Sequence, residues 1–356
     1  MNPEGSLRIT LHWDGRRIVR AGVHPRPLAP IESLLRGKLP EEALRILPML
    51  FSLCGKAQAA ACATALEAAT ERALPVIPLR RERLVLVEAV QELLWRFLID
   101  FPRLLDKPGD PALLARIRHA LSVACMEPDE RGWQEAIRRV ETVVRAALPS
   151  EDLDNADMLI AQLLHICRKE HRWGHSAVAL MPDSADIPAV LVPGLLARAD
   201  FPAFPQWKGA PVETGSLARM HRHPAVAASL SIQGTSIFSR VLARLVEIND
   251  LFVRLQAEDA GPRPWVQGAA IAGGGLAWVQ NARGLLVHYA ALDEAGRIAA
   301  YKIIAPTEWN FHPSGAFTQG LAGKAADSAE AARRHAELLA LSLDPCVTHQ
   351  IEVEHA

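Results

Sequence analysis

The sequence lacks the features that mark membrane, secreted and nucleic-acid-binding proteins. It has no uninterrupted apolar stretch long enough to cross a bilayer, and its first residues, Met1 to Gly5, lack the basic and apolar regions of a secretory signal. The formal net charge is only -1, so no basic field attracts nucleic acid or an anionic membrane. The five cysteines are an odd number scattered over 356 residues, which argues against a disulfide framework. We therefore expect a cytoplasmic protein with reduced thiols and with neither a nucleic acid nor a membrane as partner.

The composition is that of a globular protein with ample material for a core. Hydrophobic residues make up 50% of the chain and charged residues 22%. Because the chain contains no internal repeat and no low-complexity linker, we predict a single domain over residues 1–356.

The hydropathy pattern predicts an α+β fold that is mainly helical. Alternating apolar and polar residues on either side of an Asp-Gly pair predict a β-hairpin within residues 1–24. Apolar residues at helical spacing predict a helical body over residues 31–175, and the Pro- and Gly-rich stretch 180–224 is expected to be irregular. Four β-like runs separated by glycine-containing turns predict a β-region over residues 265–313. A final helix and a C-terminal cysteine segment are expected over residues 325–356, and both the hairpin and the β-region are expected to pack on the helical body.

Two cysteines near opposite ends of the chain are the strongest candidates for a metal site. Cys54 precedes a helix that begins behind Gly55, where the helix dipole favours a thiolate. Cys346 follows an Asp-Pro pair, and His349 lies three residues on, which is a spacing found among metal ligands. If the fold brings them together, two thiols provide soft ligands for a metal. The alternative is that each is a small buried apolar residue.

The remaining cysteines and histidines are weaker candidates. We expect Cys125 to be a packing residue, and Cys62 lies about two helical turns after Cys54, too far to share a metal without distortion. Charged neighbours make one further group look like a solvated helix end, so metal binding is not favoured there: His165, Cys167, His171 and His175. Cys167 is therefore also expected to pack. The pair His221 and His223 is typical of a surface or interface turn.

Five short blocks resemble the motifs of nickel-iron hydrogenase large subunits. They occur in the order of that family, span nearly the whole chain, and together are far more specific than any one of them. The blocks are Phe51 to Glu67, Val212 to Arg219, Asn281 to Tyr289, Ala305 to Asn310, and Asp344 to Cys346. The resemblance implies the fold of a hydrogenase large subunit.

The departures from those motifs concern the metal ligands. The family's second cysteine falls on Ala57 in the first block and on His349 in the last, so one cysteine of each pair remains. A nickel-iron centre normally needs four thiolates, and the missing two would bridge the metals. This pattern resembles the hydrogenase accessory proteins called HupK or HoxV.

The resemblance implies a non-catalytic scaffold in the maturation of nickel-iron hydrogenase. Such a protein would hold the Fe(CN)2CO fragment transiently before its transfer to the large subunit precursor, with HypC-type and HypD-type maturation proteins as further partners. On this interpretation Cys54 and Cys346 are the metal ligands, His349 adds a nitrogen or a hydrogen bond, and nickel is not expected.

Four further residues are expected to line the pocket around the diatomic ligands. Arg283 and Thr307 would donate hydrogen bonds to the cyanides, whereas Ala282 and Pro306 would form an apolar wall for carbon monoxide. Two other classes stay open. One is a divergent hydrogenase large subunit with a catalytic site, and the other is a metal-free structural paralogue that acts only through protein contacts.

Overall fold

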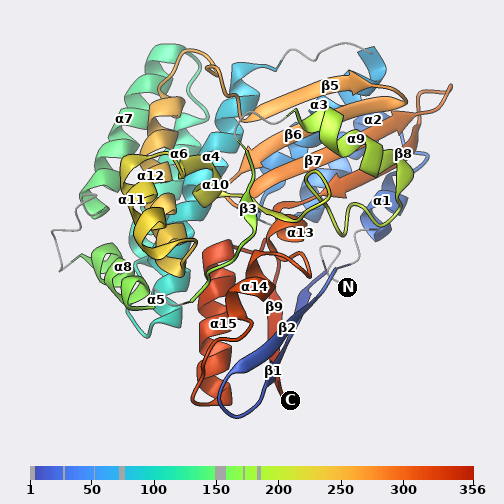
Figure 1. Ribbon diagram of the computed structural model, residues 1–356. Helices are drawn as coiled ribbons and strands as arrows, with labels where there is room; N and C mark the ends of the chain where they lie inside the picture. Colours follow the sequence, from blue (N-terminus) through green and yellow to red (C-terminus); the bar gives the residue numbers. More distant parts are fainter. Residues whose placement is uncertain are drawn as a thin grey trace.

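The computed structural model describes residues 5–26, 29–51, 53–71, 77–148, 158–170, 173–182 and 186–356. It has the α+β fold, mainly helical, that the sequence predicts. Figure 1 shows a region of packed helices beside a four-stranded sheet, with a smaller sheet and a long C-terminal helix below them.

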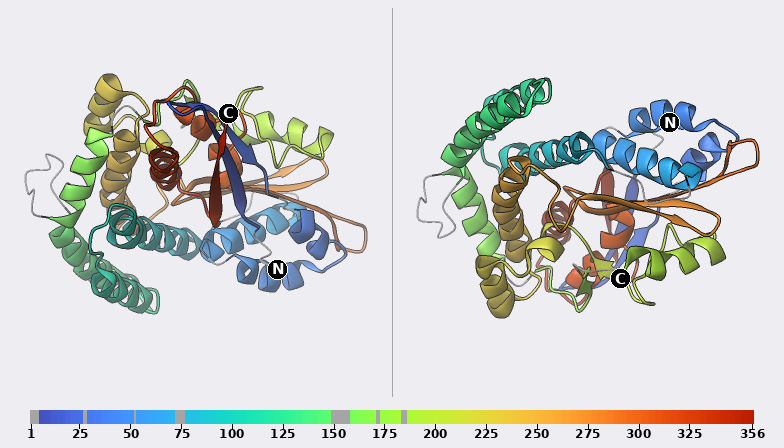
Figure 2. Two further views of the ribbon diagram at one scale, coloured as in Figure 1. Left: turned by 90° about the horizontal axis from the view of Figure 1, so that it is seen from below. Right: turned by 90° about the horizontal axis from the view of Figure 1, so that it is seen from above.

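The four-stranded sheet lies between helices on both of its faces. Its strands are antiparallel in the order β5-β6-β7-β8, with bounds Val266–Ile271, Gly274–Asn281, Gly284–Leu292 and Ile298–Ile304. Helix α3 (Gly55–Glu71) covers one face, and α9 (Ile187–Ala197) covers the other through Leu191 and Leu195. The right-hand view of Figure 2 shows the sheet between these helices.

Small residues let α3 approach the sheet closely. Its buried face is formed largely by alanines, among them Ala57, Ala61 and Ala65. Gly275 of β6 is required where the two backbones meet, because a Cβ there would lie 2.1 Å from the carbonyl oxygen of Ala65. This close contact holds α3, which begins directly after Cys54, against the sheet.

The smaller sheet joins the two ends of the chain. Strands β1 (Leu7–Trp13) and β2 (Ile18–His24) form the hairpin expected around Asp14, whose carboxylate accepts hydrogen bonds from two backbone N–H groups of the turn. The last strand, β9 (His349–His355), pairs with β1 in parallel and was not predicted. Because of this pairing, the segment that carries Cys346 lies near the N-terminal hairpin (Figure 1).

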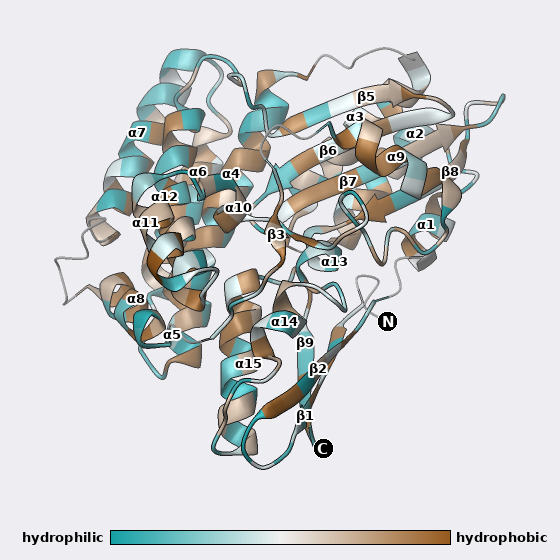
Figure 3. Cartoon of the chain, in the orientation of Figure 1, coloured by the Kyte–Doolittle hydropathy of each residue, from teal (hydrophilic) through white to brown (hydrophobic). Residues whose placement is uncertain are grey.

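The helical region follows the predicted periodicity. In α7 (Glu130–Ala147), the buried residues Trp133, Ile137, Val140 and Val144 recur at intervals of three or four. Asp129 caps this helix by accepting a hydrogen bond from Gly132 N. Figure 3 shows hydrophilic residues over the rest of α7. The other α-helices of the described residues are α1 (Ala29–Leu35), α2 (Pro40–Ile46), α4 (Leu79–Trp95), α5 (Phe101–Leu104), α6 (Pro111–Ala124), α8 (Leu159–Lys169), α10 (Ser216–Met220), α11 (Pro224–Gln233), α12 (Ile237–Leu255), α13 (Pro306–Asn310), α14 (Ala316–Leu321) and α15 (Ala329–Leu343).

The stretch 180–224 is more regular than predicted. It contains α9, α10 and the short strand β4 (Val212–Glu213), which pairs with β3 (Ala179–Leu180). Helix α9 could not be predicted from hydrophobic periodicity, because it is apolar on nearly all sides. Pro193, which usually breaks a helix, also lies inside it. None of the helices in the described ranges is long and apolar enough to span a membrane.

Candidate functional site

The fold brings the two end cysteines together. Cys54 precedes α3, Cys346 follows α15, and each residue is only 3% exposed. The two thiols interact electrostatically: burial is the main cause that raises the pKa of Cys54 well above its usual value, and the charge of Cys346 raises it further. The structure therefore places a buried pair of thiols from the two ends of the sequence close together.

The expectation that the helix N-terminus would favour the thiolate of Cys54 is wrong for the metal-free chain. The carboxylate of Glu88 in α4 already accepts hydrogen bonds from Lys56 N at 2.7 Å and Ala57 N at 2.9 Å. Its negative charge adds to the effect of burial. The thiol of Cys54 is therefore protonated at neutral pH.

Cys346 is held by donors from α13 and from the chain after β2. Thr307 Oγ1 lies 2.8 Å from Cys346 Sγ and accepts a hydrogen bond from Cys346 N at 3.1 Å. A guanidinium nitrogen of Arg26 donates to the same sulfur at 3.5 Å. Thr307, predicted to face a cyanide, thus contacts the predicted sulfur ligand itself.

The contact from Arg26 belongs to a buried ion pair that sequence reasoning missed. Arg26 Nε donates to Glu308 Oε1 at 2.7 Å, and both side chains are almost fully buried. Burial alone would lower the pKa of Arg26, but the charges of Cys346 and Glu308 raise it above the usual value. The available signal was an acidic residue at position 308 in a block where the resembling family has threonine, because a buried carboxylate requires a cation.

Arg283 lies where the two thiols and two carboxylates meet. Its Nη2 donates to Glu92 at 2.8 Å, and its Nε lies 3.2 Å from Asp344 Oδ1. Although burial opposes it, the charges of Asp344, Glu92 and both cysteines raise the pKa of Arg283. We refer to Cys54, Cys346, Thr307, Arg26 and Arg283 as the cysteine site.

Asp344 anchors the turn that carries Cys346. It adopts a left-handed conformation, with φ of 61°, and ion pairs join its carboxylate to Arg96, Arg244 and Arg283. Burial alone would raise its pKa, but these three guanidinium groups lower it to about 2. The carboxylate is therefore ionised at all ordinary pH values and fixes the loop at three points.

The predicted apolar residues lie beside these groups. Ala282 is 3% exposed in the turn between β6 and β7, next to Arg283, and Pro306 is buried at the start of α13. Behind Arg283, Gly215 has φ of 111°, and a Cβ there would lie 3.0 Å from the carbonyl oxygen of Arg283. The Val212 to Arg219 block thus forms the wall behind the cysteine site.

A pocket adjoins the segments that carry both cysteines. It measures about 690 Å³ and is lined by Leu53, Pro345 and Val347, which flank the cysteines, and by His349. Burial and the nearby charge of Arg96 lower the pKa of His349, so its imidazole is neutral at pH 7. Within the described ranges, no three His, Cys, Asp or Glu side chains form a group that could hold a metal ion. His349 as a third ligand therefore stays a prediction.

The weaker candidates lie elsewhere. Cys167 is fully buried in α8, Cys125 is partly buried, and Cys62 is buried on α3. Helix α8 ends at Lys169, so of this disfavoured group the helix carries only His165 and Cys167, and Gly174 next to His175 is left-handed with φ of 89°. His171 lies outside the described residues.

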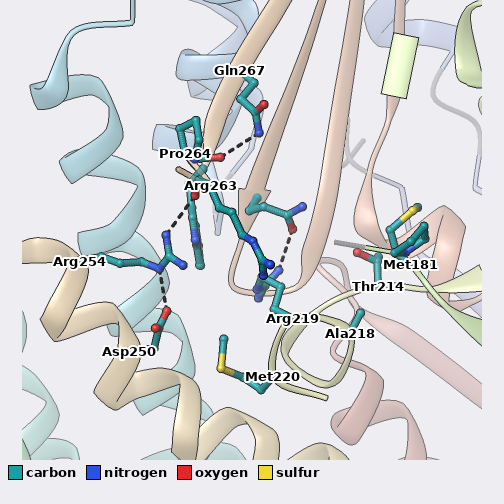
Figure 4. A pocket seen from close by; sticks show the side chains of 13 residues that line it. Met181, Thr214, Ala218, Arg219, Met220, Asp250, Arg254, Arg263, Pro264 and Gln267 are labelled. Atoms are coloured by element: carbon teal, nitrogen blue, oxygen red, sulfur yellow. Dashed lines mark hydrogen bonds and ion pairs between the residues drawn. The ribbon is translucent and has the colours of Figure 1, made fainter. Parts of the chain in front are cut away.

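A second pocket lies on the outer side of the Val212 to Arg219 block. Figure 4 shows Arg219, Arg254 and Asp250 around it. Arg254 donates to Asp250 at 2.6 Å, and Arg219 donates to Glu247 and to Gln280. Because these charges are already paired, the pocket offers no equivalent of the cysteine site.

Comparison with known proteins agrees on fold and family. No model of a protein family matches the chain. The chain is 33% identical over 350 residues to the hydrogenase expression/formation protein HoxV of Cupriavidus necator, with 90% of each chain covered. It is 30% identical over 359 residues to the hydrogenase expression/formation protein HupK of Bradyrhizobium diazoefficiens, with 98% and 97% covered.

The structural comparison shows the fold. The chain superimposes with a TM-score of 0.65 on the Ni-Fe-Se hydrogenase from D. vulgaris Hildenborough, at 15% identity and 94% coverage of each chain. It also gives a TM-score of 0.65 with an NAD+-reducing [NiFe]-hydrogenase, at 17% identity and 94% coverage of each chain.

Proposed function

Because the chain belongs to the HupK/HoxV family of hydrogenase expression/formation proteins, we propose that it holds the Fe(CN)2CO fragment transiently during hydrogenase maturation. In this role it is a scaffold and not an enzyme, and the iron fragment is its cargo. The observation that carries the proposal is the buried pair Cys54 and Cys346, flanked by two buried guanidinium groups.

The donor set suits a soft, anionic cargo. Low-spin ferrous iron with cyanide and carbon monoxide favours thiolate ligands, which Cys54 and Cys346 supply after losing their protons. Arg26 and Arg283 then offset the charge that the cargo brings into the buried site, and their N–H groups can donate to cyanide nitrogens. Ala282 and Pro306 provide apolar surface for carbon monoxide. Burial of the site keeps water and oxygen from the iron.

The absence of two family cysteines supports transient binding. Ala57 occupies a buried position at the start of α3, where the resembling family has a bridging thiolate. Without that sulfur the site lacks a bridge to a second metal, so nickel is not retained. Two sulfur ligands also hold iron less firmly than a complete set, which favours release.

The pocket beside the cysteines supports a route for the cargo. Both thiols are buried, whereas the residues that flank them line a cavity of about 690 Å³. We propose that HypC-type and HypD-type proteins deliver iron here, and that the precursor of the hydrogenase large subunit receives it. His349 would meet the fragment in this pocket with a neutral imidazole. All five cysteines are free, which suits a reducing cytoplasm.

Infrared spectroscopy tests the proposal directly. The chain is purified without oxygen from a host that contains the hydrogenase maturation proteins, and its iron and nickel contents are measured. We expect iron without nickel, together with stretching bands of cyanide and carbon monoxide. Iron that binds without these bands would contradict the proposal, and nickel with hydrogen uptake would favour a catalytic subunit instead.

A further inference from the structure

A chain of buried hydrogen bonds leads from Cys54 into the sheet. Gln58 lies one helical turn after Cys54 in α3, and its Nε2 lies 3.7 Å from Cys54 Sγ. The Oε1 of the same amide lies 2.8 Å from Nε2 of His288 in β7, and His288 Nδ1 lies 2.7 Å from the hydroxyl of Tyr301 in β8. Tyr301 is in turn hydrogen-bonded to Cys62. All the side chains in this series of hydrogen bonds are buried, and those of Gln58 and His288 are completely buried.

We propose that Gln58, His288 and Tyr301 act as positioning residues that fix one hydrogen-bond polarity and present an amide N–H to the sulfur of Cys54. This inference rests on the proposed function only in that Cys54 holds the iron fragment. It assigns a role to three buried polar residues and to Cys62 that iron ligation alone leaves without one.

The polarity follows from the donors and acceptors available. In the structure the NH2 group of Gln58 faces Cys54 Sγ. A thiolate that binds a metal keeps this orientation, because it has no proton and can only accept. The amide oxygen then faces His288 and must accept a proton from Nε2. Burial lowers the pKa of His288 to about 3, so the ring carries a single proton. Nδ1 is consequently unprotonated and accepts a hydrogen bond from the Tyr301 hydroxyl.

Each member of the chain is needed to hold the next. Without Tyr301, His288 loses the hydroxyl donor that keeps Nδ1 unprotonated. Without His288, the Gln58 amide loses the donor to its oxygen and can flip, so that its oxygen faces Cys54. Burial and the neighbouring Cys62 raise the pKa of Tyr301 well above its usual value, so its hydroxyl keeps its proton and can donate to Nδ1 of His288.

The N–H donor should lower the electron density at the iron. A hydrogen bond to a thiolate withdraws electron density from sulfur, so less density reaches iron and its diatomic ligands. In the Gln58→Met variant, which keeps a long unbranched side chain but lacks a donor, the cyanide and carbonyl bands should move to lower wavenumber and persist. Tyr301→Phe should move them in the same direction by less, because it acts through two other residues.

The matched control is Tyr289→Phe. Tyr289 lies in the same sheet, and its hydroxyl donates to Gly273 O at 3.1 Å, away from the chain. We expect its bands to coincide with those of the unaltered protein. Bands that do not move in Gln58→Met, or that move equally in Tyr289→Phe, would overturn the proposal.

A second measurement does not depend on iron. Selective ¹⁵N labelling of histidine, with His288→Asn to assign the signal, reports the tautomer of His288 in the purified chain. The expected form has a proton on Nε2 and none on Nδ1. A proton on Nδ1 would overturn the proposed polarity whatever the infrared result. If the unaltered chain binds iron without bands, the proposed function fails while the tautomer still decides this inference.

Discussion

The cysteine site and the outer helices α6 to α8 use charged residues in opposite ways. In α7 the ion pairs lie on the surface, where Glu135 pairs with Arg131 and Arg139 at one-turn spacing and is 45% exposed. Around the cysteine site, Arg26, Arg283 and Asp344 are at most 2% exposed. Surface pairs contribute little to folding, whereas buried charges carry a large desolvation cost that only close partners offset. Around the cysteine site the charges are therefore offset by close partners from other segments of the chain.

The cysteines of the two regions differ in the polar groups that surround their sulfur atoms. Cys167 of α8 packs in the apolar core, and burial is the main cause that raises its pKa to about 12. Cys54 and Cys346 are also buried, but a polar side chain lies at each sulfur: Gln58 Nε2 is 3.7 Å from Cys54 Sγ, and Thr307 Oγ1 is 2.8 Å from Cys346 Sγ. Burial alone therefore does not separate these thiols from Cys167, whereas the polar side chains around the sulfur do.

The largest expected effect concerns this difference between cysteines. Cys54→Ser or Cys346→Ser should abolish the cyanide and carbonyl bands, because serine is a poor ligand for low-spin iron. Cys125→Ser and Cys167→Ser should keep the bands, since those thiols lie outside the cysteine site. Infrared spectra and iron content of the four variants measure the contrast. Equal loss in all four would indicate misfolding and would remove the distinction between the two regions.

The next effect compares a buried with an exposed carboxylate. Asp344→Asn leaves three guanidinium groups around a neutral amide and should cost about 3–5 kcal/mol in the free energy of unfolding. Glu135→Gln on α7 should change it by about 0.5 kcal/mol or less. Urea denaturation measures both. Similar values would show that the charges at the cysteine site are solvated.

The stability that Asp344 contributes should also depend on pH. Its pKa is lowered from 3.8 to about 2 in the folded chain, so the unfolded chain binds the proton more tightly. The contribution is therefore complete above about pH 4 and is lost as the pH falls toward 2. In Asp344→Asn this part of the acid denaturation curve should be missing.

Another prediction separates two roles of Arg26, as the partner of the buried Glu308 carboxylate and as the cation beside Cys346. Arg26→Met leaves the buried carboxylate of Glu308 without its cation and should cost about 3 kcal/mol or more. The double variant Arg26→Met with Glu308→Gln removes both charges, so most of the stability should return. Iron content should stay low in both, because the cation beside Cys346 is absent. A double variant that binds iron as well as the unaltered chain would limit Arg26 to a structural role.

The sequence predicts local structure better than it predicts the surroundings of the thiols. The Asp14 turn and the four strands β5 to β8 carry their signals in neighbouring residues, and all are present. The ion pair of Arg26 with Glu308 joins residues 282 apart, and the contact of Gln58 with His288 joins residues 230 apart. No local pattern links such positions. Cys54 and Cys346 were singled out by their local settings, but only the resemblance of the motif blocks to a known family implied that the fold brings them together.

A smaller effect is expected at Glu88, which caps α3 next to Cys54. Burial is the main cause that raises its pKa from 4.5 to about 7, so the folded chain binds this proton more tightly than the unfolded chain. The contribution of Glu88 to the free energy of unfolding is therefore complete below about pH 4.5 and is lost as the pH rises toward 7, by roughly 1–2 kcal/mol after allowance for solvent screening. Glu88→Gln should flatten this slope. Glu130→Gln in α7 is the control, because Arg83 lowers the pKa of Glu130 and the pH dependence has the opposite sign.

The smallest expected effect concerns His349, which lines the pocket beside the two thiols. If iron is finally held by Cys54 and Cys346, His349→Ala should leave the positions of the cyanide and carbonyl bands unchanged. Loading should be slower, because the pocket loses its neutral nitrogen donor, so the bands should be weaker after a fixed expression time. A shift in band position would instead make His349 a direct ligand, and the cysteine site would then extend into the pocket.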